Sequence, residues 1–153
     1  MAVVNRLTAP AILAEPIYVK WKGASGRIYP FELNPIGTPY QAHPGVYIFC
    51  HFGPLNRMVA DYIDEADDFS RRIHRELTSH RQWPNIRAAG STHICTMQIP
   101  GKAAERVKVE VDLRRVITTA CNSRWGEAGA PRNTKPGAEA GLIPFRVRSD
   151  QPR

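Results

Sequence analysis

Two short apolar segments joined by a seven-residue connection constrain the fold of this chain more than any other feature. Residues 45–50 read Gly-Val-Tyr-Ile-Phe-Cys, and residues 58–63 read Met-Val-Ala-Asp-Tyr-Ile. β-branched and aromatic residues in runs of this length are typical of strands, and a short connection favours pairing of the two strands. The sequence therefore predicts a β-hairpin with Tyr47 on one strand and Tyr62 on the other.

A second β-hairpin is predicted before the first. Residues 17–22 and 27–33 alternate apolar and polar side chains, and residues 23–26 between them are Gly-Ala-Ser-Gly. Proline has no N–H to donate to a neighbouring strand, so Pro30 predicts an edge position for its strand. Residues 1–16 are expected to form an irregular arm or a short helix.

Helical patterns follow the hairpins. Asp67 or Asp68 can cap the start of a helix over residues 67–80, in which three apolar side chains follow at i, i+4 and i+8 (Phe69, Ile73 and Leu77). Arg72 and His74 lie on opposite borders of that apolar stripe.

The second half of the chain continues with a short helix, a strand and a long helix. Pro84 at the start and Gly90 at the end indicate a short helix. Residues 92–99 predict a third core strand, and residues 103–117 a second long helix. Beyond them, the Gly- and Pro-rich segment 123–140 predicts a loose linker, and residues 141–148 either a returning edge strand or a tail.

Size and charge allow one globular domain with a basic character. The chain has 153 residues, of which 42% are apolar and 23% charged, and its net charge is +7. The charge is 4 − 2 = +2 over residues 1–40, 11 − 9 = +2 over 41–122 and 6 − 3 = +3 over 123–153. This excess of positive charge favours a polyanionic partner that binds the segments on either side of residues 41–122. The alternative is that the charge serves only solubility.

The three cysteines, Cys50, Cys95 and Cys121, form no Cys-x-x-Cys pair, which favours buried thiols in a reducing compartment over a zinc site or disulfides. No apolar run approaches the ~20 residues needed to span a membrane. Residues 1–16 make a poor signal peptide. We therefore expect a cytoplasmic protein without a membrane segment.

Glu110 is the carboxylate most suggestive of a function. Ala103, Val107, Val111 and Ile117 are expected to mark the apolar face of the last helix, and Glu110 projects among them. A charge there is unfavourable unless it is paired or binds a cation. An i, i+4 ion pair with Arg114 is the structural alternative.

Four further polar residues also have two interpretations. Arg72 could grip a phosphate or simply lie at a helix border with its guanidinium in solvent. Tyr47 and Tyr62 could be ordinary strand aromatics, and Asn122 could cap the end of the last helix. Taken singly, each structural interpretation is the commoner one.

Together, the order and spacing of these residues resemble those of the GIY-YIG nucleases. The resemblance covers residues 45–122, and residues 83–93 and 27–33 are similar to a subset of bacterial members. It is carried by Gly45-Val46-Tyr47, by Tyr62-Ile63, by Asp68-Phe69-Ser70-Arg71-Arg72-Ile73, and by Glu110-x-x-Leu113 followed by Cys121-Asn122.

The resemblance implies an α/β (α+β) fold with a small central antiparallel three-stranded sheet flanked by helices. Residues 1–44 would then be an arm and β-hairpin extension, residues 45–122 the GIY-YIG-like domain, and residues 123–153 a basic tail. The implied activity is endonucleolytic hydrolysis of DNA with Mg²⁺ or Mn²⁺.

The resemblance also assigns roles. Glu110 would hold the metal, and Tyr47 would activate the water. Tyr62 and Arg72 would stabilise the charged transition state, and Asn122 would support the site. A hard cation with oxygen ligands and electrostatic stabilisation suit phosphodiester hydrolysis.

Three departures add negative charge. Asp64 replaces the glycine of the second motif, Glu65 stands where several members have a basic residue, and Glu76 stands where histidine or tyrosine often assists. Extra carboxylates would repel a phosphate or recruit more metal. His74 is a poor substitute for the assisting residue because it lies across the stripe from Arg72. The alternative function is therefore a catalytically degenerate module that binds nucleic acid or protein.

Overall fold

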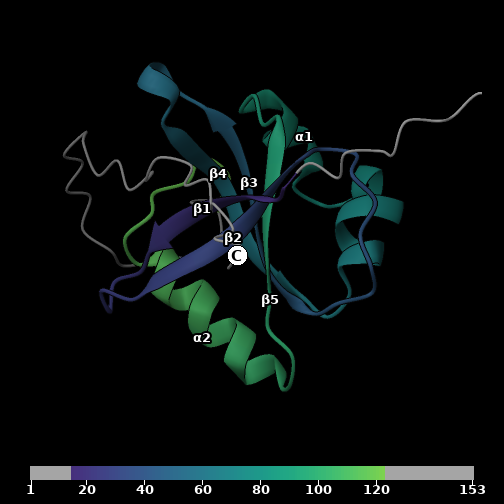
Figure 1. The fold of residues 1–153 in the computed structure, drawn as a ribbon. Helices are drawn as coiled ribbons and strands as arrows, with labels where there is room; N and C mark the ends of the chain where they lie inside the picture. The colour runs from purple at the N-terminus through teal and green to yellow at the C-terminus, as the bar shows by residue number, and fades with distance from the viewer. Residues whose placement is uncertain (1–14, 123–153) are drawn as a thin grey trace, which may run out of the picture.

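The computed structural model describes residues 15–122, which form one antiparallel five-stranded sheet with helices on both faces (Figure 1). A mixed α/β fold is therefore confirmed. The strands lie in the order β1-β2-β5-β3-β4 and comprise β1 (Ile17–Lys22), β2 (Ile28–Pro35), β3 (Gly45–Phe52), β4 (Met58–Ala66) and β5 (His93–Gln98). The expected tail at 123–153, including the strand or tail considered at 141–148, lies outside the described residues, as does all but the end of the arm at 1–16.

The expectation of a three-stranded sheet with a separate hairpin extension is wrong. β2 continues past the hairpin to Pro35, and residues Glu32–Pro35 pair antiparallel with His93–Thr96 of β5. The hairpin thereby joins the central sheet. Its turn is also tied to the last helix, because the Asp112 carboxylate accepts hydrogen bonds from the Tyr29 hydroxyl at 2.8 Å and the Ser25 hydroxyl at 2.7 Å.

The edge position expected for the strand of Pro30 is also wrong, since β2 has a neighbour on each side. Pro30 lies opposite Lys20 of β1 but before the stretch of β2 that pairs with β5. Its missing N–H therefore removes no bond to β5.

The helices are shorter than the sequence predicts. They are η1 (Pro54–Asn56), η2 (Arg71–Arg75), η3 (Leu77–Ser79), α1 (Trp83–Ala88) and α2 (Ala103–Arg114). The helix expected over 67–80 is interrupted: η2 is a π-helical turn, in which the Glu76 N–H donates to the Arg71 carbonyl at 2.9 Å, and η3 is a 3₁₀ turn. The Asp68 carboxylate accepts from the Arg71 N–H at 3.1 Å, as an N-cap does.

Two cores lie on opposite faces of the sheet. One core, on the α2 side, includes Ile48, Ile63 and Leu113. The other lies under η2, η3 and α1 and contains the predicted stripe of Phe69, Ile73 and Leu77, which is buried as expected. Tyr47 and Tyr62 both belong to this second core, so the two tyrosines share one face of the sheet.

A β-bulge brings Tyr62 to that face. Phe49 of β3 lies opposite Tyr62, but the next residue, Cys50, lies opposite Ala60, which leaves Asp61 as an extra residue in β4. Ala60 packs on the α2 side and Tyr62, two residues later, on the other. Without the extra residue, the two-residue period of a strand would keep both side chains on one face.

Helix α2 is rotated relative to the expected apolar face. Val107 and Val111 are 43% and 39% exposed and Ala103 is also exposed, whereas Arg106 is buried. The reason is a polar contact with β4: the Arg106 Nε donates to the Glu65 carboxylate at 2.7 Å. Ile117 is buried, as expected, but lies beyond the end of the helix.

Gly45, the first residue of the Gly-Val-Tyr segment, is required by close packing. A side chain there would collide with the Met97 carbonyl of β5 and come within 2.6 Å of the Phe69 ring. The absence of a Cβ therefore lets β3 approach β5 and lets Phe69 cover the start of β3.

All three cysteines are buried with free thiols, which confirms the prediction that they are buried. The Sγ atoms of Cys50 and Cys95 lie 3.6 Å apart on neighbouring strands.

Across residues 15–122, no helix is both long enough and apolar enough to span a lipid bilayer.

Candidate functional site

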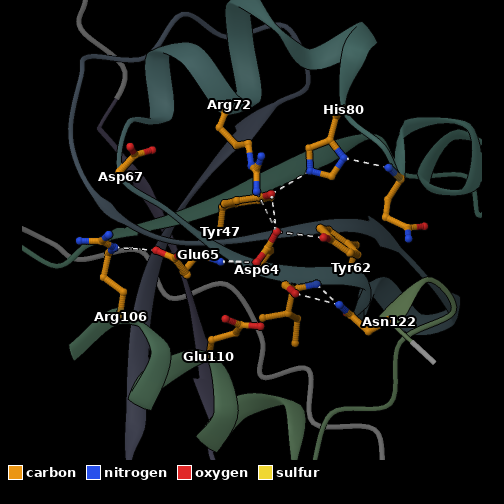
Figure 2. Close-up of polar contacts among 12 residues, drawn as sticks. Tyr47, Tyr62, Asp64, Glu65, Asp67, Arg72, His80, Arg106, Glu110 and Asn122 are labelled. Atoms are coloured by element: carbon orange, nitrogen blue, oxygen red, sulfur yellow. Dashed lines mark hydrogen bonds and ion pairs between the residues drawn. The ribbon is translucent and has the colours of Figure 1, made fainter. Parts of the chain in front are cut away.

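Three hydrogen-bond donors from three elements converge on the carboxylate of Asp64 (Figure 2). The Tyr62 hydroxyl of β4 donates to Oδ2 at 2.9 Å, and the Tyr47 hydroxyl of β3 donates to the same oxygen at 3.2 Å. The Arg72 guanidinium of η2 lies 3.5 Å from that oxygen. The structure thus brings three of the expected site residues together around an anion that the chain itself supplies.

Asp64 occupies its place without backbone strain. It pairs with Tyr47 across the β3–β4 ladder and is not among the residues of positive φ. Its second oxygen, Oδ1, accepts the N–H of Glu65 at 2.9 Å. Both carboxylate oxygens therefore have partners, and this position does not require the conformational freedom of glycine.

His80, which the sequence interpretation missed, also contacts Tyr47. Its Nδ1 accepts the backbone N–H of Gln82 at 3.1 Å, so in the neutral ring the proton is on Nε2. Nε2 lies 2.8 Å from the Tyr47 oxygen and donates to it, which leaves the phenolic proton of Tyr47 free to bind Asp64. Burial lowers the pKa of His80, and the nearby Arg72 lowers it further, so the ring is neutral at neutral pH.

Tyr47 is a hydrogen-bond donor in this arrangement. Burial raises the pKa of Tyr47 well above its ordinary value, and the negative charge of Asp64 raises it further. The side chain is fully buried, and its ring packs edge-on against His80. Activation of water by Tyr47 would therefore require a change in these surroundings, above all at Asp64.

The signal for His80 is a continuation of the apolar stripe. His80 follows Leu77 by three residues, and it is 9% exposed. The histidine expected to be a poor substitute, His74, is exposed, as is Glu76. The π-helical turn η2 and the 3₁₀ turn η3 lie between Arg72 and His80, so the exact position of His80 relative to Arg72 does not follow from regular α-helical spacing.

Glu110 reaches the site from the other side of the sheet. It lies on α2 near the Asp64–Glu65 edge of β4 (Figure 2), with a side chain only 12% exposed. The Arg114 guanidinium donates to it at 2.9 Å, so the i, i+4 ion pair considered from the sequence is present. Burial raises the pKa of Glu110, and the negative charges of Asp64 and Glu65 add to this increase.

The surroundings of Glu110 suit a largely hydrated Mg²⁺ or Mn²⁺. A carboxylate held near other negative charges gains most from a cation, and Mg²⁺ commonly binds one or two protein carboxylates and several waters. No cluster of three or more His, Cys, Asp or Glu placed to hold a metal occurs among residues 15–122.

Asn122 clamps the backbone between Tyr62 and Asp64. Its side-chain amide accepts the Ile63 N–H at 2.7 Å and donates to the Ile63 carbonyl at 2.9 Å. β4 is an edge strand, and this amide replaces a neighbouring strand at that point. Asn122 does not cap α2, which ends at Arg114. Its role in the structure is to position the strand that carries Tyr62 and Asp64.

Asn122→Ala should lower the free energy of unfolding by about 1–2 kcal/mol, because it removes both bonds to Ile63. Amide hydrogen exchange should locate the effect, with exchange at Ile63 accelerated at least about tenfold. Asn85→Ala, which removes a part-buried side-chain contact to Gln82 far from β4 in the sequence, is the control and should leave exchange at Ile63 unchanged. Unchanged exchange at Ile63 would contradict the positioning role.

A hollow of about 330 Å³ opens over the site. Its lining contains three arginines, Arg72, Arg81 and Arg114, and one carboxylate, Asp64. Its other lining residues are Tyr62, Ile63, His80, Gln82 and Asn122. Guanidinium groups that line a hollow can bind an anionic ligand, although Arg72 and Arg114 already pair with Asp64 and Glu110.

The three departures from the family pattern differ in their surroundings. Asp64 lies at the centre of the donors. Glu65 is neutralised by Arg106 on the α2 side, and Glu76 is exposed and does not line the hollow. The negative charge expected to repel a phosphate is thus concentrated in one residue, Asp64.

Comparisons with protein-family models, with curated proteins and with solved structures find no match. What the site can do is therefore argued from its own geometry. That geometry is an anion site formed by two phenols and a guanidinium, with a partly buried glutamate, Glu110, at its border.

Proposed function

We propose that this protein is a divalent-metal-dependent DNA endonuclease of the GIY-YIG type. The observation that carries the proposal is the convergence of Tyr47, Tyr62 and Arg72 on one anion, with Glu110 of α2 beside β4. Two hydroxyl donors and a guanidinium supply the contacts that a phosphodiester needs, and they project from a rigid sheet and a helical turn.

In this proposal, Arg72 and Tyr62 bind the non-bridging oxygens of the scissile phosphate and stabilise the charge that develops on them. Tyr47 faces the same point and is held by His80, so it would position or activate the attacking water once Asp64 has moved away from it. Glu110 would hold Mg²⁺ or Mn²⁺, which when bound polarises the phosphate and stabilises the leaving oxygen. Asn122 keeps the strand of Tyr62 in place.

DNA is the proposed substrate because phosphate binding gains from positive charge. The chain carries +7 overall, and the hollow presents Arg72, Arg81 and Arg114. Contacts of this kind weaken steeply as salt concentration rises. Binding of duplex DNA should therefore fall strongly between low and moderate salt.

Arg72→Ala should reduce metal-dependent plasmid cleavage by about 10²-fold, because one charged contact to the transition state is lost. Arg71→Ala is a closely matched control: the two side chains are 44% and 47% exposed and each pairs with an aspartate, but Arg71 binds Asp67, away from the site. Cleavage by Arg71→Ala should stay within about twofold of wild type. Equal losses in both variants, or a pure wild type inactive with Mg²⁺ and Mn²⁺ on duplex and single-stranded DNA, would refute the proposal.

A second candidate function is a nucleic-acid-binding module that retains the fold without catalysis. Two observations favour it: Asp64 occupies the anion position, and Glu110 is paired with Arg114. This function predicts salt-sensitive DNA binding without added metal that is unchanged in Glu110→Ala. Cleavage by the wild-type protein would exclude it.

A further inference from the structure

The two tyrosine hydroxyls of the candidate site already donate to Asp64. Each tyrosine hydroxyl has one proton, and both protons are directed to Oδ2 of Asp64, at 2.9 and 3.2 Å. For Tyr47 the direction is fixed by His80, because Nε2 of His80 supplies the proton that the Tyr47 oxygen accepts. Neither hydroxyl can donate to a second anion while Asp64 stays in place.

The position of Asp64 is suited to a phosphate. A carboxylate and a phosphodiester both present a pair of anionic oxygens, and arginine binds either of them. Oδ2 lies among two phenols and a guanidinium, and the carboxylate lines the floor of the 330 Å³ hollow with 22% of its side chain exposed. A phosphate entering from the hollow would be repelled by the charge of Asp64 at the position where the two hydroxyls and the guanidinium converge.

We propose that Asp64 acts as an internal competitor for phosphate: its carboxylate occupies the phosphate position of the site, and a phosphodiester binds Tyr47, Tyr62 and Arg72 only when Asp64 leaves them. The proposal rests on the phosphate-binding part of the proposed function and not on catalysis. It makes Asp64 the residue that determines the affinity of the site for phosphodiesters.

The neighbouring structure allows such an exchange. Asp64 lies on the edge strand β4, and the Ile63 backbone beside it is held by Asn122 independently of the Asp64 side chain. Arg72 is 47% exposed and reaches in from η2, so it can follow an anion into the hollow. Loss of the carboxylate would leave the donors, the strand and the hollow in place.

The test is phosphate binding by wild type, Asp64→Ala and Asp64→Asn, titrated with inorganic phosphate and then with thymidylyl-thymidine at constant ionic strength. The signal is the side-chain Nε–H resonance of Arg72 in NMR spectra. Asp64→Ala should bind at least tenfold more tightly than wild type, and Asp64→Asn, which keeps the shape but not the charge, should gain less. Asp67→Asn is the control, because it removes the same charge from a side chain that is 68% exposed and pairs with Arg71. It should change the affinity for phosphate by less than twofold.

Adding Arg72→Ala to Asp64→Ala, with binding followed by the backbone amide resonances of Tyr62 and Ile63, should abolish the gain in affinity and so assign the gain to this site. If Asp64→Ala does not fold, Asp64→Asn alone decides. The proposal is overturned if the folded Asp64 variant binds phosphate at Arg72 no more tightly than wild type does.

Cleavage assays on the same proteins separate this proposal from the nuclease proposal. Tighter phosphate binding by Asp64→Ala with no cleavage by any variant supports the role of Asp64 and refutes the nuclease. Cleavage by wild type with no gain in phosphate binding or rate in Asp64→Ala supports the nuclease and refutes the role of Asp64.

Discussion

Glu110→Gln should reduce metal-dependent DNA cleavage by at least about 10³-fold, or about 4 kcal/mol of transition-state stabilisation, while leaving the protein at least as stable. The loss follows from the proposed role of Glu110, because an amide is a weak ligand for a hard cation. The stability follows from its surroundings: burial, Asp64 and Glu65 disfavour the ionised carboxylate in the folded protein.

The stability difference should depend on pH in a defined direction. The pKa of Glu110 is raised above its ordinary value of 4.5 in the folded protein, so ionisation at neutral pH weakens the fold. Glutamine cannot ionise. The variant should therefore exceed wild type in free energy of unfolding near pH 7, and the difference should vanish as the pH falls below that ordinary value.

Glu105→Gln is the matched control. Glu105 lies on the same helix and also pairs with a cation, Lys108, but it is 57% exposed. Its loss should leave cleavage within about twofold and stability within about 0.5 kcal/mol of wild type. Urea unfolding at pH 4 and pH 7, together with plasmid cleavage in Mg²⁺, measures both effects. A Glu110→Gln protein that retains cleavage would show that Glu110 is only the partner of Arg114.

Asp61→Ala should be the most destabilising of the substitutions considered, at about 3 kcal/mol. The Asp61 carboxylate is 2% exposed and accepts a hydrogen bond from the Ser91 hydroxyl at 2.5 Å, while the His51 Nδ1 lies 2.9 Å from the same oxygen. Asp61 is also the extra residue of the bulge, and its carbonyl accepts the N–H of Cys121, next to Asn122. Alanine would leave two partly buried polar partners without their acceptor.

Thermal unfolding should show a decrease in Tm of about 10 °C for Asp61→Ala. Asp67→Ala, which removes an exposed partner of Arg71, is the comparison and should change the free energy of unfolding by less than about 0.5 kcal/mol. Ser91→Ala removes only one of the two contacts of Asp61, so its loss of stability should lie between those of Asp61→Ala and Asp67→Ala. A Tm for Asp61→Ala close to that of wild type would mean that the carboxylate does not hold the bulge together.

Local patterns predicted most of the elements. Alternation and β-branched content placed all five strands, with β1 at its observed bounds, and the spacing of Phe69, Ile73 and Leu77 identified a buried stripe. Asp68 and Pro84 marked helix starts. These signals depend on neighbouring residues in the chain, so they are readable without a structure.

Pairing between distant segments was not predictable in the same way. The hairpin of β1 and β2 joins β5, some 60 residues away, through backbone bonds that leave little trace in side-chain pattern. The rotation of α2 follows from the contact of Arg106 with Glu65 of β4. A carboxylate on a distant strand outweighed the apolar face that Val107 and Val111 suggest.

For the site, the sequence by itself determined which residues to examine: Tyr47, Tyr62, Arg72, Glu110 and Asn122 stand in the order of one family pattern. Only the tertiary structure decided how they meet. It placed Asp64 among the donors, brought His80 to Tyr47 and set Asn122 on the strand backbone. The physical reason is that the direction of a hydrogen bond and the occupant of a charged site depend on groups brought together from separate elements, and spacing along the chain does not record them.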